Sequence, residues 1–118
     1  MKYTPNMKLE IRTPGPNGRR GEVAATVDAM RLNRWFSVHD YATYYPGRRW
    51  AVTHIPSTLA VAHLTTLRQA VNLASALGVL GLEHPGLWRF SSRRGFERKP
   101  KELRERVAAL VRAAKVQR

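Results

Sequence analysis

Large and small side chains alternate with a period of two in the middle of the chain, as is typical of β-strands. The alternation runs through residues 50–54 and returns in residues 59–63. Pro56 and Ser57 separate the two runs and suit a tight turn. The pattern predicts two antiparallel strands joined by a hairpin, around which the rest of the chain is expected to pack.

Three further segments have a strand pattern. Residues 35–41 and 7–11 are short strand candidates, and residues 22–33 fit either a strand or a helical face, with the strand interpretation preferred. Between them, residues 13–21 contain too many prolines and glycines for a helix or a central strand. This segment is predicted to be a loop or mobile arm.

The register of the predicted sheet follows from its two turns. Pro46 and Gly47 suit the central positions of the first turn. The expected cross-strand pairs are Tyr41–Val52, His39–His54, His54–Leu59 and Trp50–His63. One face of the sheet is then expected to carry His39, Tyr41, Trp50, Val52, His54, Leu59, Val61 and His63. A slip of one residue in either turn would move these side chains to the opposite face.

Two helices are predicted after the strands. Thr66 and Gln69 form a capping-box pattern at the start of the first, and Gly78 provides a left-handed stop. The second is expected over residues 100–116, because an apolar stripe recurs there at helical spacing. Lys101, Arg104 and Arg112 lie away from that stripe.

These elements predict a single α+β domain at residues 1–118. We expect an antiparallel sheet of three to five strands packed on one central helix, plus a basic C-terminal helix. Residues 1–21 would be a loop-rich basic arm, residues 22–90 the core of sheet and helix, and residues 91–118 a basic loop and helix.

Charge changes this picture, because it is unevenly distributed. The formal net charge is +13, from 21 Lys and Arg against 8 Asp and Glu. Residues 1–49 contribute +5 (9 basic, 4 acidic), residues 50–88 contribute zero (Arg68 and Glu83), and residues 89–118 contribute +8 (11 basic, 3 acidic). A near-neutral core with cationic flanks is typical of a protein that binds polyanions.

The densest basic group lies at the start of the C-terminal region and is the main candidate site for nucleic acid, since guanidinium groups bind phosphates bidentately and stack on bases. Its residues are Arg93, Arg94, Phe96, Arg98, Lys99, Lys101 and Arg104. A second group surrounds the first turn and the N-terminal loop, where exposed aromatic rings beside arginines would suit base stacking. Its candidate contact residues are Arg19, Arg20, Tyr44, Tyr45, Arg48 and Arg49.

Catalysis and metal binding are not expected. The chain has no cysteine, which excludes thiolate nucleophiles and sulfur-ligated zinc. His39, His54 and His63 share the predicted sheet face, but no carboxylate accompanies them there, and packed histidines at the edge of a face are the more common situation. We expect no catalytic residue, no metal and no cofactor.

Three consecutive strands followed by a capped helix resemble the three-stranded DNA-binding domains of phage-type integrases and plant AP2 factors. The likeness covers residues 35–77 and implies a sheet that lies in the major groove. The strand Trp50–His54 with its downstream Ala-rich helix also resembles short uncharacterised proteins of bacteriophages and mobile elements. That second resemblance implies a small inhibitor of a host or defence complex.

The sequence therefore favours a non-catalytic nucleic-acid-binding accessory protein, with DNA or RNA as partner. The alternative is a phage-type, anti-CRISPR-like inhibitor whose cationic surface binds an acidic protein. Without an apolar run near the roughly 20 residues that cross a bilayer, or a signal peptide, we expect no membrane association. A cytoplasmic monomer or homodimer is expected, in the host cytoplasm if the protein is phage-encoded.

Overall fold

The computed structural model describes residues 1–41 and 49–117, apart from the side chains at positions 14, 18 and 20. Its fold is α+β, with an antiparallel sheet of five strands in the order in which they follow along the chain. The strands are β1 (Met7–Pro14), β2 (Arg20–Arg31), β3 (Phe36–Asp40), β4 (Trp50–His54) and β5 (Leu59–Leu64).

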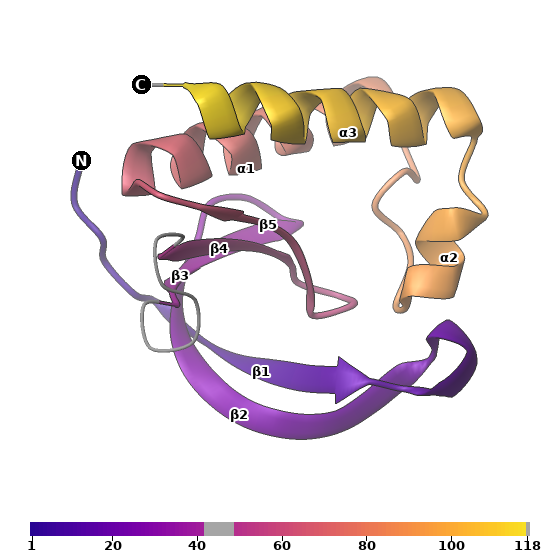
Figure 1. Ribbon diagram of the computed structural model, residues 1–118, viewed down its shortest axis with the longest axis horizontal. Coiled ribbons are helices and arrows are strands. Elements are labelled where there is room, and N and C mark those ends of the chain that lie inside the picture. Colours follow the sequence, from indigo (N-terminus) through magenta and orange to yellow (C-terminus); the bar gives the residue numbers. More distant parts are fainter. Residues whose placement is uncertain (42–48, 118) are drawn as a thin grey trace.

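Two helices, α1 (Leu67–Glu83) and α3 (Lys101–Val116), form a layer on one side of β3, β4 and β5, and the long β1–β2 hairpin curls beneath the other side (Figure 1). The short α2 (Arg93–Glu97) lies beside the sheet, next to the tip of that hairpin (Figure 1). α1 contacts β3, β4 and β5, while α3 contacts both α1 and β5. Packing on one central helix is therefore not confirmed, because α1 and α3 both touch the sheet.

Residues 13–21 are not a loose arm, which corrects the sequence-based expectation. They form the end of a hairpin, in which a one-turn 3-10 helix, η1 (Pro16–Gly18), joins β1 to β2. Asn17 has a φ of 56°, in the left-handed region that asparagine tolerates better than most residues. The Gly15 N–H donates to the Arg19 carbonyl and the Arg19 N–H donates to the Pro16 carbonyl, each at 3.1 Å, and these bonds close the turn. The prolines and the asparagine thus shape the tip of a ribbon.

The register between β3 and β4 also differs from the prediction. His39 pairs with Ala51, and Phe36 rather than His39 lies opposite His54. The Tyr41 N–H donates to the Arg49 carbonyl. The pairing of β3 with β4 is shifted from the predicted register by an odd number of residues, which exchanges the two faces of β3. His39 consequently lies on the opposite face from His54.

The second turn confirms one predicted pair and changes the other. His54 lies opposite Leu59, as expected, but Trp50 lies opposite Leu64 and not His63. The cause is a β-bulge, because Val52 pairs with Ala62 while Thr53 pairs with Ala60. His63 thus lies opposite Ala51, on the face that carries His39.

The capping box at the start of α1 is confirmed. The Thr66 hydroxyl accepts a hydrogen bond from the Gln69 N–H at 3.1 Å, and the Gln69 side chain accepts one in return from the Thr66 N–H at 3.2 Å. These bonds satisfy donors that a helix start otherwise leaves unpaired.

Gly78 does not end α1, which continues to Glu83. This glycine is buried inside the helix, where an added Cβ would lie 2.5 Å from the Asn33 side-chain nitrogen. Asn33 donates to the Ala74 carbonyl of α1 at 2.9 Å and accepts from the backbone N–H of Phe36 at 3.0 Å. The missing side chain therefore makes room for a link between α1 and the β2–β3 turn.

None of the helices in the described residues is long and apolar enough to cross a membrane.

We predict that Thr66→Ala lowers the free energy of unfolding by about 1 kcal/mol, because it removes the N-cap of a helix that covers three strands. Thr66→Ser keeps the hydroxyl and should retain most of the stability. Chemical denaturation of the three proteins measures the difference. An unchanged midpoint in the alanine variant would show that the cap contributes nothing.

Candidate functional site

Trp88 anchors the segment that leads from α1 towards α2. Its indole N–H donates to the Leu77 carbonyl of α1 at 2.8 Å, and 2 % of the residue is exposed. The ring meets Phe36 of β3 edge to face, with centroids 4.7 Å apart. An added Cβ on Gly81 would come within 2.5 Å of the indole, so glycine is required there. The segment is thus attached to both the helix and the sheet.

His54, the last residue of β4, connects that segment to the sheet. Its Nε2 lies 2.8 Å from the Trp88 carbonyl and its Nδ1 lies 2.7 Å from the Ser57 hydroxyl. A carbonyl only accepts, so Nε2 carries the proton and Nδ1 accepts from Ser57. Burial lowers the pKa of His54 to about 4, against the smaller opposing effect of the bond to Trp88. The imidazole is neutral and structural.

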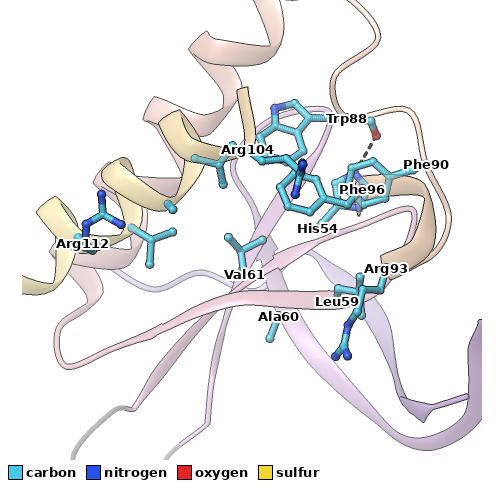
Figure 2. Close-up of a pocket in the computed structure, with 13 residues that line it drawn as sticks. His54, Leu59, Ala60, Val61, Trp88, Phe90, Arg93, Phe96, Arg104 and Arg112 are labelled. Carbon is cyan, nitrogen blue, oxygen red and sulfur yellow. Dashed lines mark hydrogen bonds between the residues drawn. The ribbon is translucent and has the colours of Figure 1, made fainter. Parts of the chain in front are cut away.

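A groove of about 470 Å³ opens beside this contact, between α3 and the edge strand β5. Aromatic side chains close one part of it, where the Phe90 ring stacks on His54 with centroids 4.1 Å apart. Aliphatic side chains of Val61, Val107 and Val111 line the rest. Figure 2 shows Arg112 at one end of the groove and Arg93 at the other.

Arginines from distant parts of the chain meet at the Arg93 end. A second hollow of about 100 Å³ is lined by Arg12 of β1, Arg19 beside η1 and Arg93 of α2. Contacts between α2 and η1 bring these elements together (Figure 1). Because Arg93 also lines the groove, the two hollows share one wall. The hairpin tip, α2 and α3 therefore contribute to one cationic surface.

Much of this positive charge is not balanced by acidic side chains. Within residues 1–41 and 49–117, five ion pairs occupy five of the eight acidic residues. Arg12 takes part in one of them, with Glu10, but Arg19, Arg93 and Arg94 take part in none of the five. Guanidinium groups that are not engaged in an ion pair remain available to phosphate.

The predicted residues of the C-terminal group separate into two sets. Arg93, Phe96 and Arg104 line the groove, and Arg94 and Arg98 are exposed beside it on α2 and at its end. Lys99 and Lys101 have other partners.

The Lys99 ammonium donates to the Gly86 carbonyl at 2.8 Å, and Lys101 pairs with Glu105 of the same helix at 3.8 Å. Lys99 lines a different hollow, on the side of α3 that faces the end of α1. Neither lysine lines the groove or the hollow beside η1.

The second predicted group is only partly described. Arg49 is paired with Asp40 at 2.6 Å, and its guanidinium lies 4.9 Å from the centroid of the Trp50 ring, so it is not brought to the groove. Arg19 joins the site through η1, and the side chain of Arg20 lies outside the described part of the structure. Tyr44, Tyr45 and Arg48 lie outside the described residues altogether.

Sequence reasoning missed Arg12 and Arg112 as members of this surface. Arg112 stands two turns after Arg104 in α3, with Ala108 midway between them. This i, i+4, i+8 spacing places all three residues on one side of the helix. From the sequence, it was the signal that Arg112 shares a surface with Arg104. Arg12 carried no such signal, because its position depends on the curl of the β1–β2 hairpin.

The three histidines do not share one face, because His39 and His63 lie on one side of the sheet and His54 lies on the other. Among the described residues, neither His39 ring nitrogen has a hydrogen-bond partner, although the residue is 1 % exposed. Burial, followed by the nearby charge of His63, lowers the pKa of His39 to about 4. Among the described residues, no group of three or more His, Asp or Glu side chains is placed to hold a metal ion.

No protein-family model, curated protein or solved structure matches the chain.

Because His39 and His54 are buried, we predict that the free energy of unfolding decreases in mild acid. An unfolded histidine binds a proton below its ordinary pKa of 6.5, whereas His39 and His54 in the folded protein do so only below about 4. The free energy of unfolding should therefore decrease between these values as the pH falls. From about pH 6 to about pH 5 the expected loss is about 1 kcal/mol per pH unit for each histidine.

His39→Leu isolates one of the two titrations. Because its ring nitrogens have no partners in the described structure, the apolar replacement should keep the stability at neutral pH. It should also remove about half of the loss in acid. Denaturation curves at about pH 6 and about pH 5 test this, and an equal acid dependence in both proteins would refute it.

Proposed function

We propose that the protein is a non-catalytic nucleic-acid-binding accessory protein. The observation that carries the proposal is the position of Arg93, which lines both the groove beside β5 and the hollow beside η1. Arginines of the hairpin tip, α2 and α3 thereby adjoin one another. We use the name arginine surface for Arg12, Arg19, Arg93, Arg94, Arg98, Arg104 and Arg112.

Phosphate is the chemical group that suits such a surface best. Several guanidinium groups in one region neutralise neighbouring phosphates and release condensed counterions, which favours binding without any sequence preference. Arg104 is also held by a bond from its Nε to the Lys99 carbonyl at 3.0 Å, so this guanidinium has a fixed position at the groove. A positioned guanidinium loses less freedom when it binds than a free one does.

The proposed contact uses helices and a hairpin tip, and not the sheet face that the resemblance to integrase and AP2 domains implied. Every residue of β4 is buried, as are four of the five residues of β3. The centre of the sheet thus offers little surface that a DNA groove would reach. The arginine surface lies at the edge of the fold, where the backbone of a nucleic acid has access.

A second candidate function is binding to an acidic protein. It is favoured by an apolar patch elsewhere on the molecule, where Val79 and Leu82 of α1 are 53 % and 81 % exposed. A hollow of about 480 Å³ lies there, lined by Trp35 together with Arg34 and Arg89. Exposed apolar side chains rimmed by charge are typical of protein interaction sites. An inhibitor of a host complex would use this patch.

We predict that the affinity for duplex DNA decreases with salt, with a slope near −0.9 per phosphate contacted in a plot of log K against log salt. Replacing Arg93, Arg94 and Arg98 together by Ala should flatten that slope by about two to three units, because up to three contacts are removed. Retardation or fluorescence-anisotropy titrations at several salt concentrations measure it.

A matched control removes three positive charges from the opposite end of the molecule. Lys2, Arg68 and Lys115 are exposed and lie near the N-terminus, the start of α1 and the end of α3, far from α2 in Figure 1. Their triple alanine variant should change the slope by less than one unit. Equal effects of the two variants would mean that binding depends on net charge and not on the arginine surface.

Two further outcomes decide between the candidate functions. If duplex DNA, single-stranded DNA and RNA all fail to bind at about 50 mM salt, the proposal is wrong, because even non-specific association is detectable there. Capture of an acidic protein from nuclease-treated lysate that is lost in a Val79→Ser, Leu82→Ser variant would then support the second candidate.

A further inference from the structure

The groove beside β5 is larger and more apolar than phosphate binding alone requires. Its volume of about 470 Å³ falls within the range of about 300 to 1,000 Å³ that small-molecule sites occupy. Phosphates need only cations at a surface. The groove therefore suits an apolar or aromatic group that is attached to an anion.

Aromatic and aliphatic side chains of this groove match the flat face of a nucleobase. Phe90 and Phe96 are half-buried there, with their ring centroids 5.5 Å apart, and each also packs against Trp88. Val107 and Val111 supply the opposite wall from α3. Base–aromatic stacking contributes to binding of every base, because each base has a π-face.

The arginines are placed to hold the phosphates on both sides of such a base. Arg104 and Arg112 stand eight residues apart on α3, which corresponds to roughly 12 Å along the helix axis. Arg93 lies at the other end of the groove (Figure 2). A strand that places a base in the apolar groove would therefore pass guanidinium groups before and after it.

A nucleobase fits the groove better than an added peptide strand does. β5 is an edge strand, and strand addition requires a regular run of backbone groups along that edge. The bulge between Ala60 and Ala62 interrupts the run where Val61 enters the groove wall. A base makes no such demand on the backbone of β5.

We propose that the groove is a nucleobase pocket that receives an unstacked base from single-stranded nucleic acid, while Arg93, Arg104 and Arg112 hold the adjacent phosphates. This inference rests on the proposed function and specifies its substrate class. A base within a duplex is stacked and paired, so it does not reach an apolar pocket unless it is flipped out. Single strands should therefore be preferred to duplexes.

The test compares an oligothymidylate with an abasic sugar-phosphate oligomer of equal length and with a duplex. Wild-type protein should bind the oligothymidylate about tenfold more tightly than the abasic oligomer, in keeping with the usual contribution of one stacked base. The abasic oligomer has the same phosphates and lacks only the bases. The ratio of the two affinities thus measures the pocket, and the duplex affinity measures the arginine surface.

Two double variants test whether the ratio of the oligothymidylate and abasic affinities depends on the groove. A108L/V111L adds aliphatic bulk at two positions that line the groove, without adding a ring that itself stacks on bases. A109L/A113L adds bulk to the same helix at exposed positions that do not line it. The first variant should reduce the ratio to about one and leave duplex and abasic affinities within twofold of wild type. The second should keep the wild-type ratio.

Equal affinity of the wild-type protein for the oligothymidylate and the abasic oligomer would overturn the inference, as would an unchanged ratio in A108L/V111L. An equal loss of affinity for all three ligands in that variant would also overturn it, because the groove would then serve the backbone alone. In each of these cases duplex binding persists in the wild-type protein, so the proposed function stands. Absence of binding to all three ligands would contradict both.

Discussion

The buried hydrogen bond from His54 to the Trp88 carbonyl is the contact on which the rest of the site depends. It joins the end of β4 to the segment that follows α1, and the bond from the Trp88 indole to Leu77 fixes the same residue to the helix layer. α2 has no buried residue of its own. Its place in the fold therefore depends on Phe96, which packs against Trp88 and Phe90.

This arrangement explains how a near-neutral core positions a cationic surface. The core cluster contains Trp88, Phe36 and the apolar face of α1, and no Lys or Arg of the described residues is buried. Arg93 follows Trp88 by five residues and is brought beside Arg19 of the β1–β2 hairpin, 74 positions earlier in the chain. Apolar contacts around Trp88 hold this segment in the fold, and the arginines remain at the surface. A neutral His54 preserves the anchor at neutral pH, because its Nδ1 must accept from Ser57.

Local patterns predicted local structure well. The Thr66 capping box, the hairpin at Pro56 and the strand around Val52 each depend on residues close together in sequence, and all are present, although β4 is buried on both faces and not on one. The β3–β4 register could not be derived, because an odd change of offset in one turn exchanges the faces of a strand. The end of α1 was predicted wrongly because Gly78 makes room for the side chain of Asn33, which lies 45 residues away in the sequence.

The candidate site was predicted only in part, because it too combines local patterns with contacts between residues far apart in the sequence. Basic residues of α2 could be identified from local charge density, whereas the groove depends on a bulge in β5 and on where α3 rests against it. Lys99 shows why counting charges along the sequence does not identify the contact residues. Its ammonium donates to the Gly86 carbonyl, on another side of the molecule. Charge density identified a region, and packing decided which of its cations share a surface.

Arginine side-chain NMR provides the most direct test of the central claim, that the arginine surface around α2 is the contact for nucleic acid. In a titration of isotope-labelled protein with single-stranded DNA, the Nε–H resonances of Arg19, Arg93 and Arg104 should shift together. That of Arg68, at the start of α1, should remain in place. Shifts concentrated at Arg34 and Arg89, around the exposed Val79 and Leu82, would contradict the account.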